Sequence, residues 1–207
     1  MTSPRVLSIL LVAALTCSAI ANVQAQPSLP VNSYVDPCLS VCPAGDIIFH
    51  VDMRDADNNP IFNSTVILDF GGCPDLVLCP LTGSEPYEVT GRLITQVAAS
   101  GAAEFPIHAG GVCGGGPEVS IFGNGFFMGG RAVSSPDQNG DGVVDTVDGA
   151  ILTAKLAGPY DRTADLNCSG SLERGDESTF ANHLGHSWPT VVPTRITSWA
   201  RIKMLYR

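Results

Sequence analysis

Alternating apolar and polar residues mark the first predicted strand, "IIFHVDM", at residues 47–53. Ile47, Phe49, Val51 and Met53 fall on one face, and the residues between them, including His50, fall on the other. A period of two is typical of a strand that buries one face. The turn cluster "ADNNP" follows, and the β-branched run "STVILDF" predicts the next strand.

Similar short runs continue to about residue 134. They are "YEVTGRLITQV", "AAEFPIHA" and "EVSIFGNGFFM", and Gly or Pro separates them. Several short strands with frequent turns predict a β-sandwich rather than alternating strands and helices. We expect this mainly β sandwich over residues 46–134, after an extended Pro-rich segment at 26–45.

The pattern changes after Ser135, where acidic loops are each followed by apolar residues at helical spacing. In "TVDGAILTAKLAG" these are Val147 and Ile151, and in "RGDESTFANHLGH" they are Phe180 and Leu184. We therefore expect a small α-helical domain over residues 135–188. Residues 189–207 read as a Pro-containing linker and a short basic tail.

The N-terminal segment has the pattern of a secretory signal peptide. A basic residue, Arg5, precedes an apolar run, and small-residue cleavage motifs end at Ala21 and Ala25. The run is too short to span a membrane, which takes ~20 apolar residues. We expect residues 1–25 to be removed and the mature chain to be secreted or held at the cell surface.

The cysteines fit an exported chain. Of seven, Cys17 leaves with the signal peptide, and an even number remains. In an oxidising compartment an even count indicates disulfides. Sequence alone does not fix their connectivity, and the local pairs Cys38–Cys42 and Cys73–Cys79 are the expectation that we test below.

The formal net charge of −9 narrows the class of partner. Nucleic acid is not expected, because phosphate binding requires clustered Lys and Arg. A negatively charged protein attracts cations, and we expect them to bind at the acidic residues after Ser135.

The stretch from Asp137 to Asp148 fits a Ca²⁺-binding loop. Such a loop supplies oxygen ligands from places 1, 3, 5, 7, 9 and 12, with Gly at place 6. Those places hold Asp137, Asn139, Asp141, the carbonyl of Val143, Asp145 and Asp148. Gly142 stands at place 6, and Val144 at place 8 is the apolar residue that would pair two such loops.

A second copy begins at Asp165. Its six ligand places hold Asp165, Asn167, Ser169, the carbonyl of Ser171, Glu173 and Asp176, with Gly170 at place 6 and Leu172 at place 8. Ser169 replaces a carboxylate, and fewer ligand charges weaken binding. We predict two Ca²⁺ sites, the second weaker than the first.

Part of the sandwich resembles the bacterial Ig-like domains of surface proteins. The resemblance rests on "MRDADNNPIFNSTVIL" and the later "ITQVAASGAAEF", with Asn59 where that family usually has Gly. It implies a spacer or adhesive module without catalysis.

The two loops together resemble the dockerin type I domain. Gly and Pro before each loop exclude an entering helix, and each loop closes with Asp in place 12, as dockerin loops do. The resemblance implies a Ca²⁺-dependent fold that docks onto a cohesin-type partner. Its recognition residues at places 10 and 11 correspond here to Thr146 and Val147, and to Arg174 and Gly175; because the pairs differ, symmetric two-way docking is not expected.

Other functions are weighed against this interpretation. The chain has no Gly-x-Ser-x-Gly, His-Glu-x-x-His or phosphate-loop motif, so we do not expect an enzyme. A carbohydrate-binding sandwich, or an accessory of a polysaccharide-degrading system, is the alternative, although such a platform needs several exposed aromatic residues and the β domain offers Tyr87 and a few Phe residues with the pattern of buried strand positions. His183 and His186 could bind zinc, but the sequence shows no third ligand, and a helix-end role is the alternative.

Overall fold

The structure is a computed structural model, and it describes residues 29–79, 81, 83–114 and 118–188. The predicted signal peptide and basic tail lie outside the described residues. The strands and helices are, in chain order, β1 (Tyr34–Val35), β2 (Leu39–Ser40), β3 (Ile48–Asp52), β4 (Ser64–Asp69), β5 (Val77–Leu78), β6 (Glu88–Thr90), β7 (Leu93–Ala98), β8 (Ala102–Pro106), β9 (Ala109–Gly110), β10 (Val119–Gly123), β11 (Phe126–Arg131), β12 (Val133–Ser134), α1 (Thr146–Leu156) and α2 (Arg174–His183).

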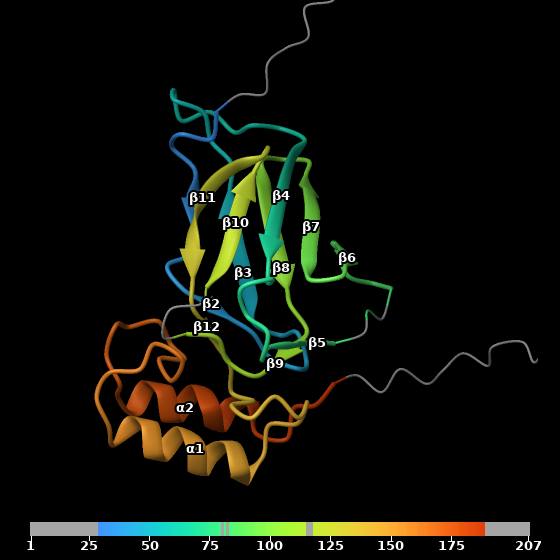
Figure 1. Cartoon of the computed structure of the whole chain (residues 1–207). Helices are drawn as coiled ribbons and strands as arrows, with labels where there is room; N and C mark the ends of the chain where they lie inside the picture. The colour runs from blue at the N-terminus through green and yellow to red at the C-terminus, as the bar shows by residue number, and fades with distance from the viewer. Residues whose placement is uncertain (1–28, 80, 82, 115–117, 189–207) are drawn as a thin grey trace, which may run out of the picture.

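Two antiparallel sheets form the body of the molecule. One has the order β1-β3-β8 and the other the order β11-β10-β4-β7-β6. Figure 1 shows β3 and β8 lying behind β10 and β4, so the sheets form two layers. The strand runs predicted from alternation each appear as strands, and Asn124-Gly125, both at positive φ, make the tight β10–β11 turn.

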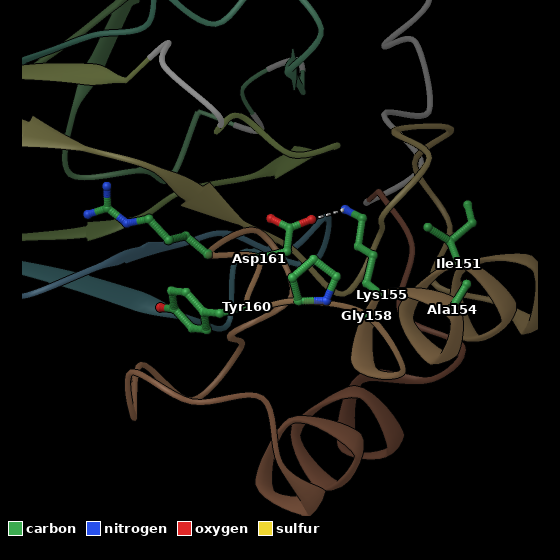
Figure 2. Close-up of a pocket in the computed structure, with 8 residues that line it drawn as sticks. Ile151, Ala154, Lys155, Gly158, Tyr160 and Asp161 are labelled. Atoms are coloured by element: carbon green, nitrogen blue, oxygen red, sulfur yellow. Dashed lines mark ion pairs between the residues drawn. The ribbon is translucent and has the colours of Figure 1, made fainter.

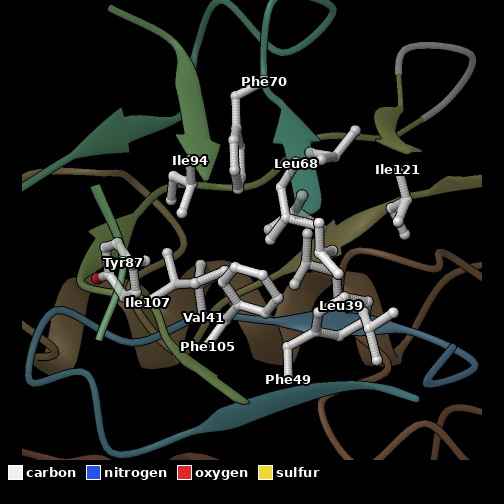
Figure 3. Close-up of a cluster of buried hydrophobic side chains, with 14 of the residues drawn as sticks. Leu39, Val41, Phe49, Leu68, Phe70, Tyr87, Ile94, Phe105, Ile107 and Ile121 are labelled. Atoms are coloured by element: carbon white, nitrogen blue, oxygen red, sulfur yellow. The ribbon is translucent and has the colours of Figure 1, made fainter. Parts of the chain in front are cut away.

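The core lies between these layers and explains the alternation. Phe49 and Val51 of β3 point inward and are 2% and 0% exposed, whereas Ile48 between them is 45% exposed. They pack in one cluster with Leu68 of β4 and Ile94 of β7 from the other sheet. Figure 3 shows Phe49, Leu68 and Ile94 among the side chains that lie between the sheets. A mainly β fold with two helices is therefore confirmed.

Two small sheets at the base of the sandwich lead into the acidic region. β12 pairs in parallel with β2, and β5 pairs with β9. The pairing places residues that follow β2 beside residues that follow β12, and the Ser40 and Ser134 hydroxyls meet at 2.8 Å. Because Ser135 and Asp137 are buried there, the predicted domain boundary near residue 134 falls inside the packed base.

The two helices lie side by side below that base, as Figure 1 shows. Leu152 of α1 packs with Ala164 and Leu166, and Phe180 of α2 completes this second, smaller core. A Cβ on Gly149 would approach the Phe180 ring to 3.2 Å, so the small residue lets the helices close. Each helix follows an acidic loop, as the sequence predicted.

The disulfides differ from the predicted local pairs. Cys38 pairs with Cys168, and Cys73 pairs with Cys113, while Cys42 and Cys79 are buried free thiols. Both local pairs were predicted wrongly, and for Cys38 and Cys42 the reason is that β2 extends the chain between them. Four extended residues span about 13 Å, and a disulfide requires Cα atoms about 4.4–6.8 Å apart.

Neither helix of the described part of the chain combines the length and apolar character that crossing a bilayer requires.

Candidate metal sites

The first acidic loop closes around two buried carboxylates. Asp137 accepts hydrogen bonds from the backbone N–H groups of Gly140 at 2.7 Å and Gly142 at 2.8 Å. Asp148, in the first turn of α1, accepts from the N–H groups of Asn139 at 3.1 Å and Asp145 at 2.9 Å. Places 1 and 12 of the loop are thereby drawn together, and the helix start is tied to the loop.

The second loop repeats this arrangement. Asp165 accepts from the N–H groups of Ser169 at 3.0 Å and Gly170 at 2.9 Å. Asp176, in the first turn of α2, accepts from Leu166 at 2.8 Å and from Glu173 at 2.9 Å. The recurrence means that the two segments fold by the same local rules.

The carboxylates at places 1 and 12 of both loops are buried, and no positively charged side chain pairs with them among the described residues. Asp137, Asp148 and Asp176 are 0% exposed and Asp165 is 5% exposed. None of the four forms an ion pair with Lys, Arg or His among the described residues. Buried carboxylates require compensation by hydrogen bonds and a cation, so the residues present fit a bound metal ion.

The remaining predicted ligand places add further oxygen atoms that could bind a metal ion. In the first loop, Asn139 donates to Asp141 at 2.9 Å, and Asp145 accepts from the N–H of Val147 at 2.7 Å as the cap of α1. In the second loop, Asn167 donates to Glu173 at 3.3 Å, and the Ser169 hydroxyl donates to the Ser171 carbonyl at 3.1 Å. The Val143 carbonyl, at place 7, completes the first set, so both donor sets are all-oxygen, which suits Ca²⁺.

Burial raises the pKa of Asp137. The N–H groups of Gly142 and Gly140 lower this pKa, while the nearby carboxylates of Asp148 and Asp141 raise it further. Crowded like charges in a buried loop favour protonation, and a bound cation reverses that preference.

The glycine at place 6 of the first loop is required by conformation and by space. Gly142 has φ +90°, and a Cβ there would lie 2.7 Å from the indole ring of Trp188. Gly170, at the same place in the second loop, has φ +79° and open space around it. At place 6 the first loop is therefore covered by Trp188, and the second loop is open there.

The pairing of the two loops through place 8 was predicted wrongly. The N–H of Val144 donates to the carbonyl of His186 at 2.8 Å, and its carbonyl accepts from Gly185 at 2.8 Å. Both backbone groups are thus used by the segment that follows α2, and Leu172 instead packs against the small helical core. The C-terminal end of the described chain takes the position expected for the second loop.

The four predicted recognition residues are the first two of each helix. Thr146, Val147 and Arg174 are exposed, and Val147 is 53% exposed although it is apolar. Gly175 differs, because a Cβ there would lie 2.1 Å from the Asn167 side chain, which fills the space above it. Gly175 therefore has a packing reason in the loop, in addition to any contact with a partner.

A hollow of about 760 Å³ lies beside the end of α1, lined by Ile151, Ala154, Lys155, Tyr160 and Asp161 among others (Figure 2). Its Lys155 Nζ lies 3.7 Å from Asp161 and donates to Gln138 and Thr163, both at 2.8 Å. Partial burial raises the pKa of Asp161, but the hydrogen bonds from Thr163 and the charge of Lys155 outweigh it and lower the pKa overall. The contacts of Lys155 with Asp161 and Thr163 therefore fix the segment that joins the two acidic loops to the end of α1.

A second kind of ligand cluster forms where α2 ends. The ligand atoms of Cys42, Asp46, His183 and His186 all lie within 4.8 Å of one another. Sequence reasoning found the histidine pair but no partner for it, since Cys42 and Asp46 are about 140 residues away along the chain. The one local signal in the sequence is the "CPAGD" turn, where Gly45 lets the chain bring a thiol and a carboxylate together.

The sandwich has both buried and exposed aromatic residues. Tyr87 is buried, and its hydroxyl donates to the Pro106 carbonyl at 3.0 Å. Phe126 and Phe127, however, are 40% and 64% exposed at the β10–β11 hairpin, and Phe62 is 64% exposed. The hairpin turn lifts its two phenyl rings away from the core.

No protein-family model, curated protein or solved structure matches this chain.

Proposed function

We propose that this is an exported, non-catalytic attachment protein in which an Ig-like β-sandwich carries a dockerin-like pair of Ca²⁺-stabilised loop–helix units. The observation that carries the proposal is the set of four buried carboxylates without a cationic partner among the described residues. They occupy the first and last places of both loops, Asp137 and Asp148, Asp165 and Asp176.

Different residues of each loop have different roles in binding the ion. When bound, Ca²⁺ supplies the positive charge that the carboxylates lack and accepts their free lone pairs. Asp148 and Asp176 each belong to a helix and accept N–H groups from the loop before it, so they transmit loop order to the helix start. Gly142 and Gly170 let the backbone turn toward the site.

The first loop is the stronger site in this proposal. It has Asp141 at place 5, where the second loop has Ser169, and Trp188 covers it at Gly142. Greater ligand charge and a better shielded site both favour cation binding.

Attachment is proposed to use the exposed helix starts. Thr146 and Val147 on α1 and Arg174 on α2 are accessible, and a cohesin-type protein is the partner that the resemblance implies. Because a polar and an apolar residue stand on one helix and a cation on the other, a partner would engage the two helices differently. The two disulfides support the exported location, since disulfides persist in oxidising compartments.

Calcium calorimetry on the mature chain tests this function. After chelation and removal of the chelator, we expect two Ca²⁺ ions to bind, one more tightly than the other. Asp148→Asn should abolish the tighter event and Asp176→Asn the weaker, because each removes a charged ligand and leaves a similar shape. Asp57→Asn, in an exposed turn of the sandwich, is the matched control and should bind like the parent.

The same proteins then test attachment against a panel of immobilised cohesin domains. Capture should require Ca²⁺ and disappear when both Asp148 and Asp176 are replaced. Absence of any Ca²⁺ binding at millimolar concentration contradicts the whole proposal, whereas Ca²⁺ binding without capture contradicts the attachment role alone.

A second candidate function, carbohydrate binding, is favoured by the exposed hairpin aromatics. Phe126 and Phe127 border a hollow of about 360 Å³ with Leu29 and Val31. Sugars stack on exposed rings, so a soluble-polysaccharide binding screen should detect retention that Phe127→Ala removes and Phe62→Ala preserves. Retention that both variants share, or none at all, rejects this candidate.

A further inference from the structure

The turn after β2 brings a thiol and a carboxylate to the base of the sandwich. The N–H of Gly45 donates to the carbonyl of Cys42 at 2.9 Å, which closes the turn. Gly45 has φ +70°, and a Cβ there would lie 2.4 Å from the His108 ring, so the turn admits only glycine without rearrangement. Cys42 is fully buried. Its sulfur and a carboxylate oxygen of Asp46, four residues later, belong to one cluster of possible metal-ligand atoms.

The end of α2 presents two imidazoles to this turn. His183 Nδ1 lies 2.7 Å from the carbonyl of Thr179, which can only accept, so Nδ1 carries the proton. In the neutral ring, Nε2 of His183 is then the nitrogen with the free lone pair, and it lies 3.6 Å from Asp46. An imidazole oriented by a carbonyl on its far nitrogen is the arrangement found around protein-bound metals.

His186 is held by the first acidic loop. Its carbonyl accepts from Val144 at 2.8 Å, and Gly185 next to it donates to the Val144 carbonyl at 2.8 Å. Its Nδ1 lies 3.1 Å from Asp46 and 3.8 Å from the Cys42 sulfur. The His183 ring and the His186 backbone are thus held by contacts outside the cluster itself.

The spacing matches a tetrahedral ion. Zn²⁺ binds sulfur at about 2.3 Å and nitrogen or oxygen at about 2.0–2.2 Å, which places ligand atoms about 3.3–3.6 Å apart. Of the six distances among the four ligand atoms, those of 3.1, 3.6 and 3.8 Å lie close to that range, and all six are within 4.8 Å.

We propose that Cys42, Asp46, His183 and His186 form a structural Zn²⁺ site that fastens the end of α2 to the turn after β2. A thiolate and a carboxylate supply two negative charges, and two neutral imidazoles supply none, so the bound ion is fully neutralised. Four protein ligands leave no open position, which is the pattern of structural rather than catalytic zinc.

The donor set separates this site from the acidic loops. Sulfur and nitrogen ligands favour Zn²⁺, whereas the loops offer only oxygen, which favours Ca²⁺. Asp46 and His186 have side chains 40% and 35% exposed and give the ion a path into the site. The site also gives Cys42 a role as a thiol in a chain whose disulfides lie elsewhere.

Metal titration of the mature chain, with its disulfides intact and saturating Ca²⁺ present, tests this site. We expect one equivalent of Zn²⁺ to bind, measured by competition with a chromophoric chelator. Co²⁺ in its place should give the intense visible bands of a tetrahedral ion and a thiolate charge-transfer band. Cys42→Ser should remove that charge-transfer band, and His183→Ala should weaken Zn²⁺ binding at least about 100-fold.

Control variants show whether the loss of Zn²⁺ binding is specific to the proposed ligands. Cys79→Ser replaces the other buried thiol, and His50→Gln replaces an exposed histidine that pairs with Asp36, so both should bind Zn²⁺ like the parent. Thiol counting in denaturant without reductant should find both Cys42 and Cys79 as thiols. The proposal is overturned if Zn²⁺ does not bind, if binding survives Cys42→Ser unchanged, or if Cys42 is found in a disulfide.

Ca²⁺ calorimetry of the same variants keeps the two proposals distinct. Loss of Zn²⁺ binding in Cys42→Ser with both Ca²⁺ events retained supports the zinc site without reference to the loops. A parent protein that binds Ca²⁺ and no Zn²⁺ removes the zinc site and leaves the proposed attachment function standing.

Discussion

Removing Ca²⁺ from the mature chain is expected to lower its melting temperature by about 5–11 °C for each loop that was occupied. A ligand at about 100 times its dissociation constant stabilises the folded state by about 2.7 kcal/mol. In a protein of this size each kcal/mol shifts the melting temperature by roughly 2–4 °C. The physical source is the set of four buried carboxylates, which repel one another until a cation joins them. Differential scanning fluorimetry in Ca²⁺ and in chelator measures the shift.

Replacing the carboxylates should reproduce the chelator effect one loop at a time. Asp148→Asn should remove most of the Ca²⁺-dependent gain, since it is the stronger site that loses its charged closing ligand, and Asp176→Asn should remove a smaller part. Asp57→Asn should retain the full gain. Mg²⁺ should restore little, because it demands a smaller octahedral shell. An unchanged melting curve in chelator shows that the loops are acidic turns and not metal sites.

The features that sequence predicted best are those set by local spacing. The helix that follows each acidic loop, and the carboxylate in its first turn that accepts hydrogen bonds from that loop, depend on residues within about one loop length of each other. Asp148 serves both the loop and the first turn of α1, and such a double role is visible in the spacing alone. The inward face of β3 was also predicted correctly, because Phe49, Val51 and Met53 alternate with more exposed residues.

What sequence could not predict depends on which distant segments meet. Val144 was assigned to the second loop on the usual pairing of such loops, but the chain after α2 returns and takes its backbone groups. The same return brings His183 and His186 to Cys42 and Asp46, so one topological feature explains both the wrong pairing and the missed cluster. The exposure of Phe127 likewise depends on its place at the β10–β11 hairpin, which the apolar run "GFFM" does not reveal.

Breaking the Cys38–Cys168 disulfide is expected to cost about 5 kcal/mol of folding free energy, or roughly 10–20 °C in melting temperature. The bond closes a segment of 130 residues, and the entropy that a cross-link removes from the unfolded chain grows with the length of that segment. The Cys73–Cys113 bond spans 40 residues, so its loss should cost less, about 4 kcal/mol. Paired Cys→Ser replacements, compared by urea unfolding, measure both costs.

The longer bond has a second expected effect that the shorter one lacks. Cys168 lies inside the second loop, between the predicted ligands Asn167 and Ser169, and its bond ties that loop to Cys38, just before β2. The Cys38→Ser/Cys168→Ser pair should therefore weaken the second Ca²⁺ event and spare the first, whereas Cys73→Ser/Cys113→Ser should spare both. Cys79→Ser, which breaks no bond, is the control for the thiol replacement itself. Peptide mapping without reductant that joins Cys38 to Cys42 contradicts this pairing, and equal Ca²⁺ affinities in the two paired variants contradict the link between disulfide and loop. If both hold, the second loop, which has one carboxylate fewer than the first, owes part of its order to a covalent tie rather than to its ion.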